Sequence, residues 1–159
     1  MIHFTLIKEA EIAKALDGTF TIEQKRFIAR MSYGKVGFAF SQTPQTVKAA
    51  IEQEKILIAI LKAPAHKKIL MLEPLIKEQG TTIQNRLASL LRDILLCKIG
   101  CGVKITHRYF LKEFHILAER YSYTSLACAL SDLLRMSEER TLNLNQQLVW
   151  NNLFLKLRS

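Results

Sequence analysis

The residues able to do chemistry in this 159-residue chain are few and scattered. The histidines are His3, His66, His107 and His115. None lies in an HExxH pattern or four residues from another histidine or a cysteine, the spacing that brings two metal-binding side chains together on a helix. No GxSxG sequence marks a nucleophilic serine. The histidines therefore predict neither catalysis nor metal binding, and we expect no metal and no cofactor.

The cysteines give no stronger signal. Cys97 and Cys101 would share one helix face, but two ligands do not complete a tetrahedral zinc site. Cys101 and His107 could form a nucleophile–base pair, yet nothing in the sequence supplies a third group or an oxyanion hole. With Cys128 the count is odd, which argues against a disulfide framework. We interpret these cysteines as buried apolar side chains.

Acidic residues that are close in the sequence are interpreted as solvated helix faces. The pairs are Glu52–Glu54 and Glu138–Glu139. The sequence therefore predicts no catalytic site, and an enzyme remains open only as an all-α fold whose site leaves no motif.

Composition favours a globular, helix-rich protein. Hydrophobic residues make up 49% of the chain, which has only 6 Gly and 3 Pro. No apolar run approaches the ~18 residues that a membrane span needs. The N-terminal sequence lacks a basic region followed by an apolar block, as a signal peptide would have. We expect no membrane contact and a cytoplasmic location.

The chain is basic, with 23 Lys and Arg against 14 Asp and Glu and a net charge of +9. This charge permits a nucleic-acid or acidic-protein partner. However, the basic residues are scattered along the sequence. Lys67–Lys68 is the only adjacent lysine pair, and no aromatic residue is interleaved with it. The pattern therefore disfavours specific DNA recognition.

Residues 1–41 predict a small unit of three short helices, expected at 9–16, 22–31 and 36–41. Thr21 and Gln24 have the spacing of a capping box at the start of the second helix. Gly34 and Gly37 would permit a turn and close helix packing.

Residues 42–159 predict a helical bundle joined by short loops. Pro44 suits the first position of a helix. Pro74 is expected to kink or split a later helix, and Gly80 to end it. The strongest apolar periodicity follows, at Ile83, Leu87, Leu90, Leu91, Ile94 and Leu95. A further helix is expected to turn inward Tyr123, Leu126, Leu130, Leu133 and Leu134.

The last predicted helix, 145–157, is apolar on two sides. One wide face carries Val149, Trp150, Leu153, Phe154 and Leu157. Leu148 and Leu155 lie together on the opposite side. One face can serve the bundle and the other a neighbouring chain, although the pattern alone also allows both faces to be internal.

Two stretches of the chain resemble a single protein family. At the end, SDLLRMSEERT, a turn with Asn143 and Asn145, and QLVWNNLFLKL resemble the C-terminus of the delta-prime subunit of the bacterial DNA polymerase III clamp loader. Near the start, FTLIKEAEIAKAL and IEQKRFIARMSYGKVGFAF resemble the lid subdomain of clamp-loader AAA+ proteins. The resemblance implies an all-α chain made of a lid (1–41) and a collar domain (42–159), the C-terminal part of a longer subunit.

The resemblance also bears on whether the chain uses ATP. ATP-using relatives carry a sensor-two arginine in the lid block, and Gly37 occupies the matching position here. A glycine there is similar to the delta-prime subunits, which do not hydrolyse ATP. No GxxxxGK[ST] sequence is present either.

By this resemblance, the chain is a non-catalytic assembly subunit in a complex whose activity is that of a DNA-directed DNA polymerase. Its expected partners are the tau/gamma and delta subunits, with DNA contacted only through the complex. The candidate interface residues are Leu148, Trp150, Leu155 and Arg158. Two alternatives stay open: the same region of a tau/gamma-type subunit, and an unrelated basic, all-α nucleic-acid-binding module.

Overall fold

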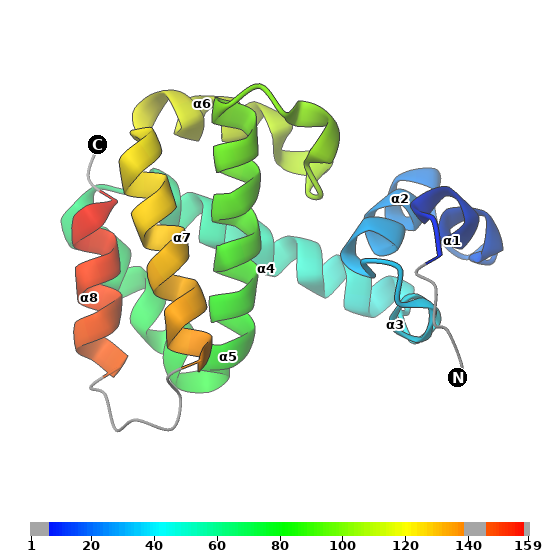
Figure 1. The fold of residues 1–159 in the computed structure, drawn as a ribbon. Helices are drawn as coiled ribbons and strands as arrows, with labels where there is room; N and C mark the ends of the chain where they lie inside the picture. The colour runs from blue at the N-terminus through cyan, green and yellow to red at the C-terminus, as the bar shows by residue number, and fades with distance from the viewer. Residues whose placement is uncertain (1–6, 139–145, 158–159) are drawn as a thin grey trace, which may run out of the picture. The chain divides into compact units, whose positions relative to one another are not determined.

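A computed structural model describes residues 7–138 and 146–157 of the chain. Its described residues form helices and no strands, so the predicted all-α class is confirmed (Figure 1). The α-helices are α1 (Glu9–Ala15), α2 (Ile22–Met31), α3 (Val36–Phe40), α4 (Pro44–Lys62), α5 (Ala65–Lys98), α6 (Leu111–Arg120), α7 (Tyr123–Glu138) and α8 (Gln146–Lys156). Two 3₁₀ turns, η1 (Gly102–Lys104) and η2 (Arg108–Phe110), connect α5 to α6.

The chain divides into two compact units, Met1–Gln53 and Glu54–Ser159. The division falls inside α4, about twelve residues after the position that the sequence suggests. The first unit thus has the beginning of α4 as well as the three predicted short helices.

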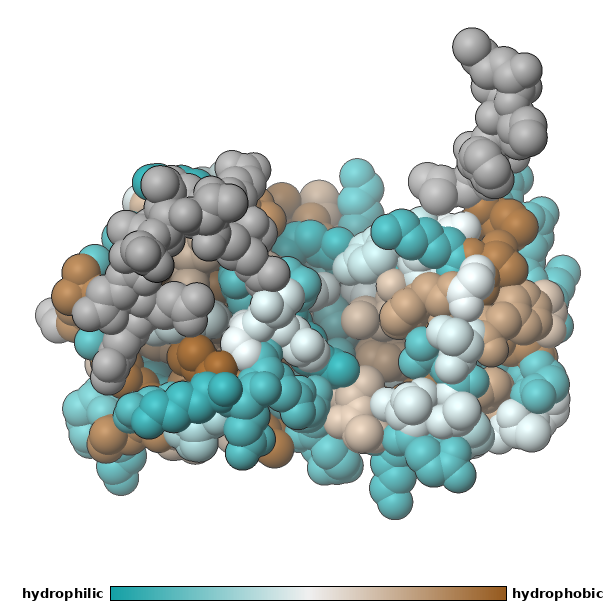
Figure 2. Space-filling model, turned by 90° about the horizontal axis from the view of Figure 1, so that it is seen from below, coloured by the Kyte–Doolittle hydropathy of each residue, from teal (hydrophilic) through white to brown (hydrophobic). Residues whose placement is uncertain are grey.

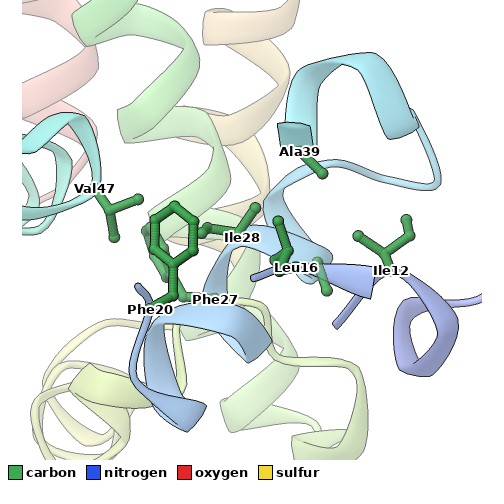
Figure 3. Close-up of a cluster of buried hydrophobic side chains, with 8 residues drawn as sticks. Ile12, Leu16, Phe20, Phe27, Ile28, Ala39 and Val47 are labelled. Atoms are coloured by element: carbon green, nitrogen blue, oxygen red, sulfur yellow. The ribbon is translucent and has the colours of Figure 1, made fainter. Parts of the chain in front are cut away.

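The first unit has its own small apolar core. Its buried side chains come from α1 to α4 and the intervening turns, and Figure 3 shows most of them: Ile12, Leu16, Phe20, Phe27, Ile28, Ala29, Ala39 and Val47. The predicted capping box is present, because Thr21 Oγ1 accepts from the Gln24 N–H and the Thr21 N–H donates to Gln24 Oε1. Phe38 and Phe40 are exposed on α3, whose buried residue is Ala39.

Helix α5 forms the centre of the second unit. It contacts α6, α7 and α8. Its backbone leaves helical dihedrals at Gln79 (φ −142°, ψ 37°), and Figure 1 shows the helix bending at its lower end. The break lies beside Gly80, as predicted. Pro74, predicted to kink or split the helix, does not split it, because it lies within the helical part of α5.

The segment of α5 after the break supplies most of the second core. Ile83, Leu87, Leu90, Leu91 and Ile94 are each at most 1% exposed, as their periodicity predicts. On α7, Leu126 and Leu133 are buried. Tyr123 and Leu134, also predicted to turn inward, are instead about half exposed.

Candidate functional site

Helix α8 packs onto the bundle through the wide apolar face that the sequence predicts. Trp150, Leu153, Phe154 and Leu157 are at most 4% exposed. The Trp150 and Phe154 rings are near-parallel, with centroids 6.4 Å apart. Burial of each large apolar side chain stabilises the fold by roughly 1.5–3 kcal/mol, so this face holds α8 against α5 and α7.

The opposite side of α8 remains apolar and exposed. Leu148 is 61% exposed and Leu155 is 46% exposed. The two residues are seven apart, so they lie almost in line along the helix. The alternative that both apolar faces are internal to one bundle is therefore wrong for Glu54–Ser159. In Figure 2, one face of the molecule shows apolar side chains only in small groups between polar ones. We call Leu148 and Leu155 the outer α8 pair.

The other two interface candidates, Trp150 and Arg158, have different outcomes. Trp150 lies in the core at 4% exposure, which leaves little of its ring for another chain. Arg158 lies outside the described residues.

Buried polar bonds fix the C-terminal end of α8. The Lys68 ammonium donates to the Leu157 carbonyl (2.8 Å) and to the Tyr121 hydroxyl (2.6 Å). Tyr121 in turn donates to the Leu61 carbonyl (2.6 Å). Burial, with the nearby positive charge of Arg120, lowers the pKa of Lys68 to about 8. One cation thus joins α4, α5, the end of α6 and α8.

An apolar groove lies between α8 and the first segment of α5. It has a volume of about 260 Å³ and is lined by Ile69, Leu72, Glu73, Ile76, Lys77, Trp150, Asn151 and Phe154. The Asn151 Oδ1 atom is buried without a hydrogen bond from any described residue. The groove and the outer α8 pair thus both involve helix α8.

A second buried network holds the loop between α5 and α6. Asp93 is fully buried, and its Oδ2 accepts from the Thr106 N–H (2.9 Å), the His107 N–H (2.8 Å) and His107 Nδ1 (2.7 Å). Its Oδ1 accepts from Arg92 (2.8 Å). Burial would raise the pKa of Asp93, but the bonds from His107 and Arg92 lower it below its usual value.

On its other side, His107 faces Glu54, with 3.4 Å between Nε2 and Oε1. Burial alone would lower the pKa of His107, but contacts with the two carboxylates raise it to about 9. Glu54 is 0% exposed and is also 3.7 Å from Arg86. The prediction that Glu54 lies on a solvated face is wrong. Since His107 is only 1% exposed, this network acts as an anchor and has no open position for a substrate.

The prediction that the cysteines are buried is wrong for Cys128, which is exposed, and Cys97 and Cys101 are only half-buried. Cys97 Sγ lies 3.4 Å from His115 Nδ1, and burial raises the pKa of the Cys97 thiol. Within the described residues, no cluster of three or more His, Cys, Asp or Glu could hold a metal ion. Nor is any described helix both long enough and apolar enough to cross a membrane.

Gly37 lies on α3, where an added Cβ would meet nothing within 4 Å. The predicted need for close packing therefore fails at Gly37. The prediction that a glycine permits the turn holds at Gly34, whose φ is +80°.

Sequence reasoning missed the buried charges Lys68 and Asp93. For Asp93 the sequence did hold a signal, because this charged residue lies within an apolar helical repeat, between Leu91 and Ile94.

The fold is that of a helical-bundle domain whose last described helix keeps an exposed apolar face. The family model described as DNA polymerase III, delta subunit, C terminal, matches residues 49–159. The chain belongs to this family, whose match covers more than two thirds of it and the whole second unit. No curated protein and no solved structure matches the chain. The family is one of clamp-loader subunits, so the chain has an assembly role in DNA replication and is not the polymerase catalytic domain.

Proposed function

We propose that the chain is the lid and collar of a delta-prime-type clamp-loader subunit, which binds its neighbours through the outer α8 pair. The observation that carries the proposal is an apolar face exposed on the last helix of the family-matched region. A helix at the edge of a monomer needs one apolar face, and a second exposed one is typical of a surface that another chain covers.

The expected neighbours are the tau/gamma and delta subunits. Two leucines form only the centre of an interface, since a stable one buries about 800 Å² on each partner. The adjoining groove and the apolar part of Asn151 extend the surface along the same helix. Such a surface suits a partner helix that brings apolar side chains.

The choice of delta-prime over an ATP-using subunit rests on Gly37. No packing contact requires a glycine there, so a larger residue such as arginine could be accommodated in the space around it. The absence of the sensor-two arginine thus fits a subunit that does not use ATP, and it disfavours the tau/gamma alternative. The lid assignment of residues 1–41, which lie outside the family match, belongs to the proposal as well.

A displacement assay separates delta-prime from delta. The chain is titrated into a reconstituted complex of tau/gamma, delta and delta-prime from the same source, and the displaced subunit is identified by sizing and electrophoresis. We expect delta-prime to leave and delta to stay. Release of delta would assign the chain to the delta type. If the folded chain displaced neither, the assembly surface on α8 would be contradicted.

A further inference from the structure

We propose that the loop joining α5 to α6 binds the phosphate backbone of single-stranded nucleic acid. Its binding surface, the basic loop surface, comprises Lys104, Arg108, Tyr109 and Lys112. The inference goes beyond the assembly role and does not depend on it. It also departs from the expectation that DNA is contacted only through other subunits.

Charge is distributed unevenly in this part of the chain. The 19 residues from 94 to 112 contain no Asp or Glu, but they contain four Lys or Arg side chains. Lys104, Arg108 and Lys112 are exposed, and no ion pair within the described residues involves them. The carboxylates of Asp93 and Glu54 are buried and already paired with His107 and arginines, so they do little to neutralise the outer cations. Glu113, which directly follows Lys112, is half-buried and can offset at most one of them.

The fold brings these cations close together. Arg108 Nη2 donates to the Val103 carbonyl (3.3 Å), which places the guanidinium beside the backbone of Lys104. Lys112 follows Arg108 by four residues where η2 runs directly into α6, so both lie within about one helical turn. The sequence alone shows them only as scattered residues.

The loop is also held in one conformation before any ligand arrives. Asp93 fixes the backbone at Thr106 and His107, and Arg92 donates to the Thr106 hydroxyl. Gly100 supplies the positive φ (+77°) that the turn after α5 requires. Since a rigid surface loses little conformational entropy on binding, even a few cations can bind phosphate usefully.

An aromatic ring favours nucleic acid over an acidic protein. Tyr109 is 38% exposed and lies next to Arg108. Single-stranded nucleic acids are bound by stacking bases on such rings while nearby cations contact the phosphates. An acidic peptide would use the cations but would not need the ring.

The test uses the full chain and a fluorescein-labelled 20-nucleotide oligo-dT, with anisotropy measured across salt concentrations. Neutralising three phosphates on a single strand predicts a slope of log affinity against log salt of about −2. The triple variant Lys104→Gln, Arg108→Gln, Lys112→Gln should lose at least tenfold in affinity and most of that slope. Tyr109→Ala should weaken binding about fivefold or more without changing the slope.

The matched control is the triple variant Lys48→Gln, Lys62→Gln, Lys67→Gln, which removes the same charge from exposed positions on α4 and α5. It should keep most of the affinity. Equal losses in the two triple variants would overturn the proposal in favour of diffuse charge attraction. Tighter binding of poly-glutamate than of oligo-dT would overturn it in favour of an acidic protein.

If the first triple variant lost its helical circular dichroism, the single change Lys104→Glu would replace it in the test. An unchanged salt slope in that single variant would count against the site.

Discussion

At the scale of single residues, buried charges determine where the irregular parts of the second unit lie. Asp93 accepts three hydrogen bonds from the Thr106–His107 segment. Lys68 donates a hydrogen bond to the Leu157 carbonyl at the end of α8. Apolar packing alone cannot specify such positions, because the hydrophobic effect does not depend on the orientation of the buried groups. A buried charge with several partners does specify them, because each missing bond has a large desolvation cost.

Replacing Asp93 with Asn tests this anchoring role. The change removes the negative charge that His107 and Arg92 share, and leaves a buried cation poorly compensated. We expect the free energy of unfolding in urea to fall by about 3–5 kcal/mol. Asp132→Asn is the control, because Asp132 pairs with Lys156 at the surface (2.6 Å) and should lose no more than about 1 kcal/mol. Similar small losses in both variants would mean that the Asp93 network contributes little.

The pH dependence of stability follows from His107. Its folded pKa of about 9 lies above the usual 6.5, so its contribution is fully present below pH 6.5 and is lost as pH rises through 9. Lys68 acts in the opposite direction, but only above its folded pKa of about 8. Between pH 6.5 and 8, therefore, the free energy of unfolding should fall by up to about 2 kcal/mol.

Urea unfolding at several pH values checks this dependence. His107→Gln should flatten the dependence between pH 6.5 and 8, whereas Lys68→Met should leave it in place. A wild-type stability that rises with pH over this interval would contradict the assigned charge state of His107.

At the scale of elements, helix α8 combines a buried face with an exposed apolar one. The prediction that separates them is Leu155→Asp. Because Leu155 is 46% exposed, the charge can remain in water, and stability should change by no more than about 0.5 kcal/mol. Affinity for the tau/gamma and delta subunits should fall at least tenfold, because the partner would have to desolvate the new carboxylate.

The matched control is Ile116→Asp on α6, which puts the same charge on a residue of similar exposure (55%). It should bind the subunits like the wild type. Equal weakening by both variants would show that net charge, and not the α8 face, controls assembly. Unfolding of the Leu155→Asp variant would show that Leu155 belongs to the core.

Several elements could be predicted from the sequence because their signals are local. The Thr21–Gln24 capping box and the periodic run after Gly80 depend on neighbours within a few residues, and both are present. The burial of Glu54 could not be predicted, because its partners are distant in the sequence at Arg86 and His107. The exposure of Leu134 likewise depends on which neighbouring helices cover α7. Pro74 is tolerated inside α5, although sequence rules place a break there.

At the scale of the whole molecule, two units with separate cores share the helix α4. The family match covers all of the second unit, and the assembly role is therefore assigned to that unit. Both buried networks and the outer α8 pair also lie in it. The first unit is the lid in our proposal, and the exposed phenylalanines of α3 are its most apolar outer feature.

The central claim is that this chain binds other clamp-loader subunits directly. Its most direct measurement is size-exclusion chromatography with light scattering, on the purified chain mixed with the tau/gamma and delta subunits from its own source. We expect a stoichiometric complex whose mass includes all of the added subunits. If the chain stays helical by circular dichroism but elutes separately from both subunits, direct binding to them is contradicted.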